Sequence, residues 1–187
     1  GAAAKTIAWN PMTQPLPAQA LEGIDTVFHL AGDPVAEGRW TAAKKARIRD
    51  SRVIGTRNLV AGIKNSLQKP TTLISASAVG IYGDRGAAEL DENTSPASDF
   101  LAEVCLGWEH EALAARNLGI RVVLIRTGIV LGKNGGALGK MLAPFQFGLG
   151  SPLGSGNQYM PWIHIEDLVE EMLFAAREPN VSGPLNG

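Results

Sequence analysis

Short apolar runs alternate with longer amphipathic segments along this chain. The runs at 25–33, 71–83 and 121–126 are rich in β-branched and other apolar residues, which predicts strands buried on both faces of a parallel sheet. Residues 6–9 and 162–165 predict further, briefer strands. Helical spacing marks 41–67, 98–118, 137–147 and the segment that begins at Glu166. Strands that alternate with helices predict an α/β fold with a doubly wound, mostly parallel sheet.

The first long helix, 41–67, has a defined start and two dissimilar sides. Thr41 is a suitable N-cap. The apolar stripe expected to be buried consists of Ala46, Val53, Val60, Ile63 and Leu67. Basic residues gather on and around the other side: Lys44, Lys45, Arg47, Arg49 and Arg52. Such a run is typical of a solvated face, and contact with an anion is the alternative.

Composition narrows the class of protein. A chain of 187 residues with 45% hydrophobic content is suited to one domain or a large part of one. A formal net charge of -1 argues against a nucleic-acid partner, and no apolar run reaches the roughly 18 residues that a membrane span needs. The single cysteine, Cys105, permits no internal disulfide and favours a reducing compartment. We therefore predict a cytoplasmic protein that acts on a small molecule, with organelle targeting as the open alternative.

The end of the strand in Thr71–Gly83 is the first candidate site. There the apolar run gives way to Ser75, Ala76 and Ser77 and then to a Tyr82-Gly83 turn. In open α/β sheets, ligands bind just beyond the carboxyl ends of the strands. Small residues would let a flat ring approach the backbone there, and hydroxyls would supply hydrogen bonds. The alternative is a buried strand that leaves the sheet through a serine-rich turn.

Several motifs in a fixed order carry a resemblance to a known family. They are HLAG (29–32), VIGTRNLV (53–60), SASAVGIYGD (75–84), RTGIVLG (126–132) and PWIHIEDL (161–168). Together they resemble the extended short-chain dehydrogenase/reductases. The more specific resemblance is to the atypical NAD-dependent epimerase/dehydratase-like branch, which is also called nucleoside-diphosphate-sugar epimerase-like and in which some members carry a cell-division-inhibitor label.

The resemblance implies one Rossmann-type domain over 1–187. It also implies that the first β-α-β portion and the C-terminal end of that domain lie outside this sequence, because the expected Gly-x-x-Gly-x-x-Gly turn would precede residue 1. Residues 133–160 and the C-terminal region would contribute to a substrate-side lobe. The favoured cofactor is NADP(H), and NAD(H) stays open because the strand that discriminates between them would also precede residue 1.

The resemblance also assigns cofactor contacts at three strand ends. Leu30, Ala31 and Gly32 would border the adenosine and diphosphate half of the cofactor, and Asp33 would accept a ribose hydroxyl. Ser75, Ala76 and Ser77 would lie beside the nicotinamide, with Ser77 nearest to the family's catalytic serine or threonine. The backbone of Thr127, Gly128, Ile129 and Val130 would face the carboxamide.

The chain departs from the family in its proton relay. The Tyr-x-x-x-Lys pair is absent, because the corresponding helix start, 98–105, has neither a tyrosine nor a lysine. Arg52 stands at the position of the family's helix asparagine. The standard relay therefore cannot operate, and the predicted catalytic residues are Ser77 and Tyr82. The alternative for Tyr82 is a turn tyrosine that packs against the following loop.

The remaining reactive side chains are expected to be structural. His29 is expected in the core, His164 at a helix cap, and Glu103 and Glu109 as solvated carboxylates. Cys105 is expected to be a buried, inert thiol because no neighbour lowers its pKa. The scattered histidines and single cysteine have no metal-ligand spacing.

Two functions follow from these predictions. The first is an oxidoreductase or epimerase-like enzyme for a polar small molecule, in which Ser77 orients or polarises a carbonyl. The second is a non-catalytic dinucleotide-binding protein that acts through a protein partner. The missing tyrosine and lysine favour the second, and the retained serines favour the first.

Overall fold

The computed structural model describes residues 5–133, 136–152 and 154–187. The strands are β1 (Thr26–His29), β2 (Thr72–Ala78), β3 (Arg121–Thr127), β4 (Ile129–Gly132), β5 (Trp162–His164) and β6 (Gly183–Asn186). The helices are α1 (Ala42–Asn65), α2 (Phe100–Leu113), α3 (Gly136–Gln146) and α4 (Ile165–Arg177). Short 3₁₀ turns are η1 (Ala18–Leu21), η2 (Val79–Tyr82) and η3 (Ala114–Leu118).

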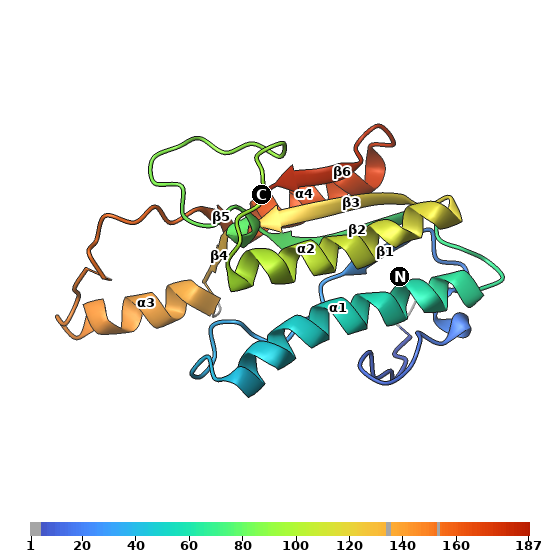
Figure 1. Cartoon of the computed structure of the whole chain (residues 1–187), viewed down its shortest axis with the longest axis horizontal. Coiled ribbons are helices and arrows are strands. Elements are labelled where there is room, and N and C mark those ends of the chain that lie inside the picture. Colours follow the sequence, from blue (N-terminus) through green and yellow to red (C-terminus); the bar gives the residue numbers. More distant parts are fainter. Residues whose placement is uncertain (1–4, 134–135, 153) are drawn as a thin grey trace.

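The main sheet is parallel and has helices on both faces. In the described chain its order is β1-β2-β3-β6, and β4 and β5 form a separate parallel pair. One face packs against α1 and α2 through a core that includes Leu73, Val122 and Leu124. The other face packs against α4 through Ile74 and Val123, among others (Figure 1). The predicted doubly wound, mostly parallel sheet is confirmed.

Burial on both faces holds for β2 and β3 but not for β1. Every residue of β2 from Thr72 to Ser75 is buried, and β3 is buried from Val122 to Arg126. In β1, which is an edge strand of the described sheet, Phe28 is 42% exposed. The expectation of full burial for that strand was therefore wrong.

The first predicted strand is absent from the described chain, since residues 6–9 form a loop without regular structure. Trp9 Nε1 donates a hydrogen bond to the Gln14 carbonyl, and Asn58 Nδ2 of α1 donates to the Pro11 carbonyl. Leu16 N–H donates to the Asn58 carbonyl. The segment folds back on α1, where Pro11 and Leu16 bond to Asn58, and the Trp9 indole bonds within the loop itself.

Helix α1 begins as predicted, but it turns a different face to the core. The side chain of Thr41 accepts a hydrogen bond from the Lys44 N–H, which confirms the N-cap. Of the expected stripe only Ile63 is buried, and Leu67 lies beyond the end of the helix and is fully exposed. The buried face consists of Lys44, Ile48, Gly55, Thr56, Leu59, Gly62 and Ile63.

The strand register brings three carboxyl ends to one edge of the sheet. His29 pairs with Ser75, and Ala78 pairs with Thr127. The chain then continues from β3 into β4, and α3 extends away from the main sheet on the side of this edge (Figure 1). The elements that carry the predicted site are therefore neighbours in space.

Candidate functional site

A cavity of about 360 Å³ lies at the carboxyl edge of the sheet. Its walls come from the ends of β1, β2 and β3 and from α1, α2 and α4. The lining residues are Leu30, Val35, Ile48, Arg52, Ala76, Ser77, Ala78, Leu101, Val104, Cys105, Trp108, Thr127, Gly128, Val130, Leu168 and Met172. A larger hollow of about 460 Å³ lies along the outer side of β1, but its lining has no charged side chain and it does not reach β2 or β3.

The cavity brings together part of each predicted strand end. Residues of the predicted set that line it are Leu30, Ala76, Ser77, Thr127, Gly128 and Val130. Ala31, Gly32 and Asp33 continue from Leu30 beside the cavity. Ser75 is fully buried within β2, where its hydroxyl donates to the Ala76 carbonyl at 3.2 Å. Ile129 pairs with Trp162 in the small sheet and does not line the cavity.

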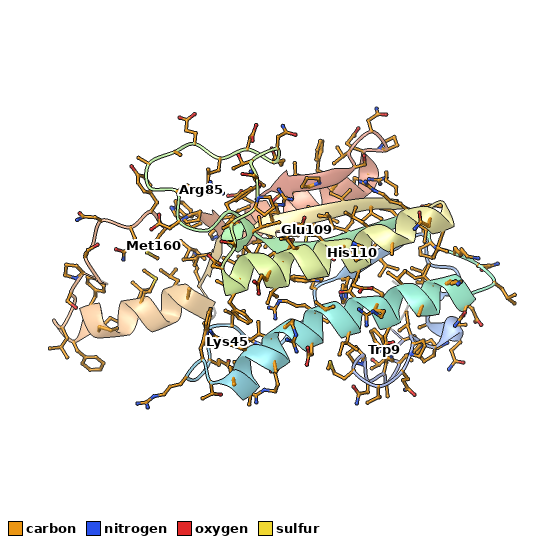
Figure 2. The ribbon with its side chains drawn as sticks, in the orientation of Figure 1. Trp9, Lys45, Arg85, Glu109, His110 and Met160 are labelled. Carbon is orange, nitrogen blue, oxygen red and sulfur yellow. The ribbon has the colours of Figure 1, made fainter. Side chains whose placement is uncertain are left out.

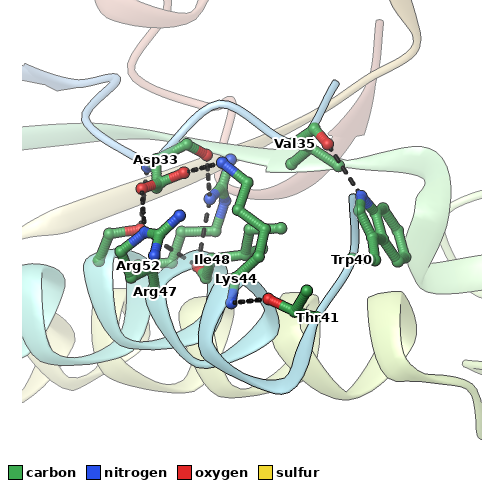
Figure 3. Close-up of polar contacts among 9 residues, drawn as sticks. Asp33, Val35, Trp40, Thr41, Lys44, Arg47, Ile48 and Arg52 are labelled. Carbon is green, nitrogen blue, oxygen red and sulfur yellow. Dashed lines mark hydrogen bonds and ion pairs between the residues drawn. The ribbon is translucent and has the colours of Figure 1, made fainter. Parts of the chain in front are cut away.

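Asp33 lies beside the cavity in an ion-pair cluster with residues of α1 (Figure 3). Its carboxylate accepts hydrogen bonds from Lys44 Nζ and from Arg47 Nε, the latter at 3.3 Å. These contacts, with the Lys44 hydrogen bond as the largest cause, hold the pKa of Asp33 below its ordinary value. The carboxylate that was expected to accept a ribose hydroxyl therefore already has two cationic partners.

Ser77 belongs to a buried network that links β2, α2 and β3. Its hydroxyl donates to Glu109 Oε1 at 2.6 Å. Arg126 donates two hydrogen bonds to the same carboxylate, from Nε to Oε1 and from Nη2 to Oε2, both at 2.9 Å. The hydrogen bond to Glu109 is the largest cause that raises the pKa of Arg126. Glu109, labelled on α2 in Figure 2, is thus a buried and paired carboxylate, and its expected solvated state was wrong.

Tyr82 lies behind this network and not in the cavity. Its side chain is 2% exposed. The hydroxyl donates to Asn186 Oδ1 at 2.7 Å and accepts a hydrogen bond from Arg126 Nη1 at 2.9 Å. The two side chains predicted to handle a proton are therefore separated, since Ser77 lines the cavity and Tyr82 does not.

The structural interpretations of the other reactive side chains fit the contacts. His29 is buried, with Nε2 2.8 Å from Thr56 Oγ1. Burial, and then the charge of Glu109, raise the pKa of Cys105 to about 11, which keeps the thiol protonated. The ring of His164 caps α4, since its Nδ1 accepts a hydrogen bond from the Glu166 N–H.

Arg52 and Trp108 are polar cavity residues that were not predicted as site residues. Arg52 comes from α1 and Trp108 from α2, and the guanidinium carbon lies 5.0 Å from the centroid of the indole ring. The signal for Arg52 was its place in the basic run together with its position at the family's helix asparagine. Trp108 has the helical spacing of a core residue, and that pattern does not distinguish a cavity wall from a core.

Within the described chain, no group of three or more histidine, cysteine, aspartate or glutamate side chains is arranged to hold a metal ion. Over the same residues, no helix is both long and apolar enough to cross a lipid bilayer.

Comparison with known proteins gives a consistent result. Residues 9–186 match the model of the NAD dependent epimerase/dehydratase family. Epimerase family protein Mb2239 of Mycobacterium bovis is 45% identical over 178 residues, which cover 95% of this chain and 58% of that protein. An Arabidopsis thaliana relative, the chloroplastic homolog of epimerase family protein SDR39U1, is 46% identical over 169 residues, 89% of this chain and 48% of its own length.

A solved structure shares the fold. The crystal structure of human epimerase family protein SDR39U1 (isoform 2) with NADPH has a TM-score of 0.82 and 35% sequence identity. The match covers 94% of this chain and 59% of the human one. The chain therefore spans about half to three fifths of the length of these relatives.

Proposed function

The chain belongs to the NAD dependent epimerase/dehydratase family, and we propose that it supplies the nicotinamide side of the cofactor site in an NADP(H)-dependent oxidoreductase or epimerase-like enzyme. The observation that carries the proposal is the meeting of three strand ends at one cavity, with Leu30, Ser77 and Thr127 on its walls. Ligands of open α/β sheets bind at this edge.

The residues present fit a nicotinamide nucleotide. Ala76, Ala78 and Gly128 have small side chains or none, so a flat ring can approach the backbone at the ends of β2 and β3. Leu30, Ala31 and Gly32 would border the remainder of the nucleotide. The human relative that was solved with NADPH supports NADP(H) over NAD(H).

A bound nicotinamide supplies hydride chemistry, and Ser77 would position the substrate beside it. The Ser77 hydroxyl already donates its proton to Glu109, whose charge is held by Arg126. Its oxygen can therefore accept a hydrogen bond from a substrate hydroxyl, whereas polarising a carbonyl would require that proton to leave Glu109. We accordingly assign Ser77 to orienting an alcohol group of a polar substrate.

A second function is favoured by the wall that α2 contributes. Leu101, Val104 and Cys105 face the cavity there, and none of them can exchange a proton near neutral pH. A site without a proton donor on this helix suits a dinucleotide-binding protein that signals to a protein partner without turnover.

The two functions are separated with the full-length protein. NADPH and NADH are titrated by their fluorescence. The protein loaded with the oxidised dinucleotide is then mixed with a broad panel of polar alcohols, and the protein loaded with the reduced one with the matching aldehydes and ketones, while nicotinamide absorbance is followed. Turnover that is lost in Ser77→Ala, with NADPH affinity retained, supports the enzyme. Ser75→Ala is the matched control, because Ser75 is buried in the same strand and does not line the cavity.

Other outcomes decide against the enzyme. A dinucleotide that binds but is neither reduced nor oxidised by any member of the panel, together with a protein partner captured only by the loaded form, supports the second function. Failure of both dinucleotides to bind would contradict the two functions alike.

Two further predictions concern the position of residues 133–160 and the compartment in which the protein is found. We propose that residues 133–160 form part of a substrate-side lobe, although positions 134, 135 and 153 lie outside the described residues and no described residue of this region lines the cavity. The exposed side chains of Leu142 and Phe145 in α3 support a role in covering the site.

We also propose that the protein is located in the cytoplasm, which the reducing compartment suggested by the single Cys105 supports. The chloroplastic name of the Arabidopsis relative keeps an organelle as the alternative.

A further inference from the structure

Arg52 presents a fixed guanidinium to the cavity. Its Nη1 donates to the Asp33 carbonyl at 3.0 Å and to the Ile48 carbonyl at 3.2 Å (Figure 3). One face of the group lies over the Trp108 ring. Gly32 lies close by, since a Cβ added there would lie 2.9 Å from Arg52 Cζ. The position of this cation is therefore set by two carbonyl groups, an aromatic ring and a glycine.

The charge of Arg52 is not balanced within the described chain. No described carboxylate lies within ion-pair distance of it. The nearby carboxylate of Asp33 is shared by Lys44 and Arg47, so three cations surround one anion. Burial lowers the pKa of Arg52 and is the largest influence on it. A cation that has lost part of its hydration is stabilised by a counter-ion, and the open side of this one is the cavity.

An independent observation points to the same ligand. Trp108 is 5% exposed, and its indole Nε1 is buried without a hydrogen-bond partner among the described residues. A buried donor without an acceptor is unfavourable by about 1–3 kcal/mol in general, so such groups are rare unless a ligand or water completes them. Trp108 lines the same cavity as Arg52, and a ligand oxygen at the edge of this stacked pair would be an acceptor for both.

We propose that Arg52 and Trp108 form a subsite for an oxyanion, a phosphate or carboxylate group, on the α1 side of the cavity. The proposal rests on the proposed function for the identity of the larger ligand but not for the anion itself. The oxygens would come from the diphosphate of the dinucleotide or from an anionic group on a separate substrate. Gly32 leaves the space for the guanidinium, and the Lys44–Asp33 pair fixes the backbone that holds it.

The test uses the full-length protein with two probes, NADPH and inorganic phosphate. Arg52→Met removes the charge and the donors but keeps an unbranched side chain against Trp108. Arg47→Met is the matched control, because Arg47 belongs to the same helix and cluster but is 61% exposed and does not line the cavity. Calorimetry measures both affinities, and the indole N–H resonance of Trp108 reports contact with the anion.

Arg52→Met is expected to lower the affinity for one of the two probes by at least about tenfold. Hydrogen bonds to charged groups contribute at least that much to affinity. Arg47→Met should change either affinity by less than about threefold, as for an exposed charge. A loss of affinity for NADPH alone identifies the diphosphate of the dinucleotide as the anion that the subsite binds. A loss confined to phosphate bound by the NADPH-loaded protein identifies a separate anionic substrate. In both cases the Trp108 resonance shifts in wild type and not in Arg52→Met.

Unchanged affinities for both probes in Arg52→Met, or equal losses in the two variants, would overturn the subsite. A wild-type protein that does not bind NADPH contradicts the proposed function alone. The phosphate titration of the unloaded protein then decides, and the subsite stands only if wild type binds phosphate and Arg52→Met does not.

Discussion

His29 makes the stability of this fold depend on pH. The imidazole is 4% exposed at the end of β1, next to the Thr56 hydroxyl and the edge of the Trp108 ring. Burial lowers its pKa from 6.5 to about 4. The folded protein therefore keeps this ring neutral at pH values where the unfolded chain protonates it.

The sign and size of the effect follow from that difference. Between pH 6.5 and about 4 the unfolded chain binds the additional proton, so the free energy of unfolding falls as the pH falls. The contribution is complete above pH 6.5 and is lost below about pH 4. At about 1.4 kcal/mol for each pKa unit, the lowered pKa of His29 corresponds to a contribution of roughly 3 kcal/mol to the free energy of unfolding.

The assay is urea unfolding of the full-length protein above pH 6.5 and near pH 4. It compares the loss of unfolding free energy between these two pH values in wild type with the loss in His29→Asn. Asparagine can still bond to Thr56 and does not titrate. The comparison removes the contribution of carboxylates such as Asp33 and Asp91, whose pKa values are lowered by side-chain hydrogen bonds. If wild type and variant lose stability in parallel, or if the His29 ring titrates near 6.5 by NMR, the reasoning is refuted.

Three further predictions concern buried contacts. Arg126→Met should cost about 3–5 kcal/mol of unfolding free energy by urea titration, because it leaves Glu109 buried without its partner, and combining it with Glu109→Gln should restore part of that loss. Alkylation of Cys105 should stay slow until the pH approaches about 11, and its pH–rate profile should move to lower pH in Glu109→Gln; an unmoved profile would contradict the contribution of that charge. Gly62→Ala should lower the urea midpoint, since its Cβ would lie 2.5 Å from a backbone oxygen, whereas Gly55→Ala, with 3.6 Å to its nearest neighbour, should not.

The sequence predicted the order of the elements well because local signals mark their ends. Thr41 caps α1, and Gly119 ends the η3 turn in the left-handed conformation with φ of 79°. The apolar runs of β2 and β3 have the composition of central strands, and both are central. The small residues in the last part of β2 indicated the edge of the sheet at which the cavity lies, since Ala76 and Ser77 line it.

The pattern failed where burial is set by something other than hydrophobicity. Gly55, Thr56 and Gly62 turn to the buried side of α1 because the helix approaches its neighbours closely there, and a hydrophobic stripe gives such residues little weight. Residues 6–9 have strand composition but no partner strand in the described sheets. In both cases a tertiary contact outweighs the local preference.

The buried carboxylate of Glu109 was missed for a related reason. Its partner Arg126 is seventeen positions away on another element, so no helical spacing connects them. A charged residue is expected at the surface unless such a partner is known. The same limit applies to Asp33, whose partners Lys44 and Arg47 come from a helix that begins after an intervening loop.

The distribution of charge around the cavity constrains the chemistry that this chain can perform. Among the lining residues of the described chain, the ionisable ones are Arg52, which stays protonated, and Cys105, whose pKa is raised to about 11. Neither exchanges a proton near neutral pH. The Ser77 hydroxyl donates its proton to Glu109, whose charge is stabilised by two hydrogen bonds from Arg126. The cavity therefore combines fixed positive charge on the α1 side with a hydrogen-bond acceptor on β2. Under the proposed function, such a site would hold and orient an anionic alcohol better than it would supply an acid to a carbonyl.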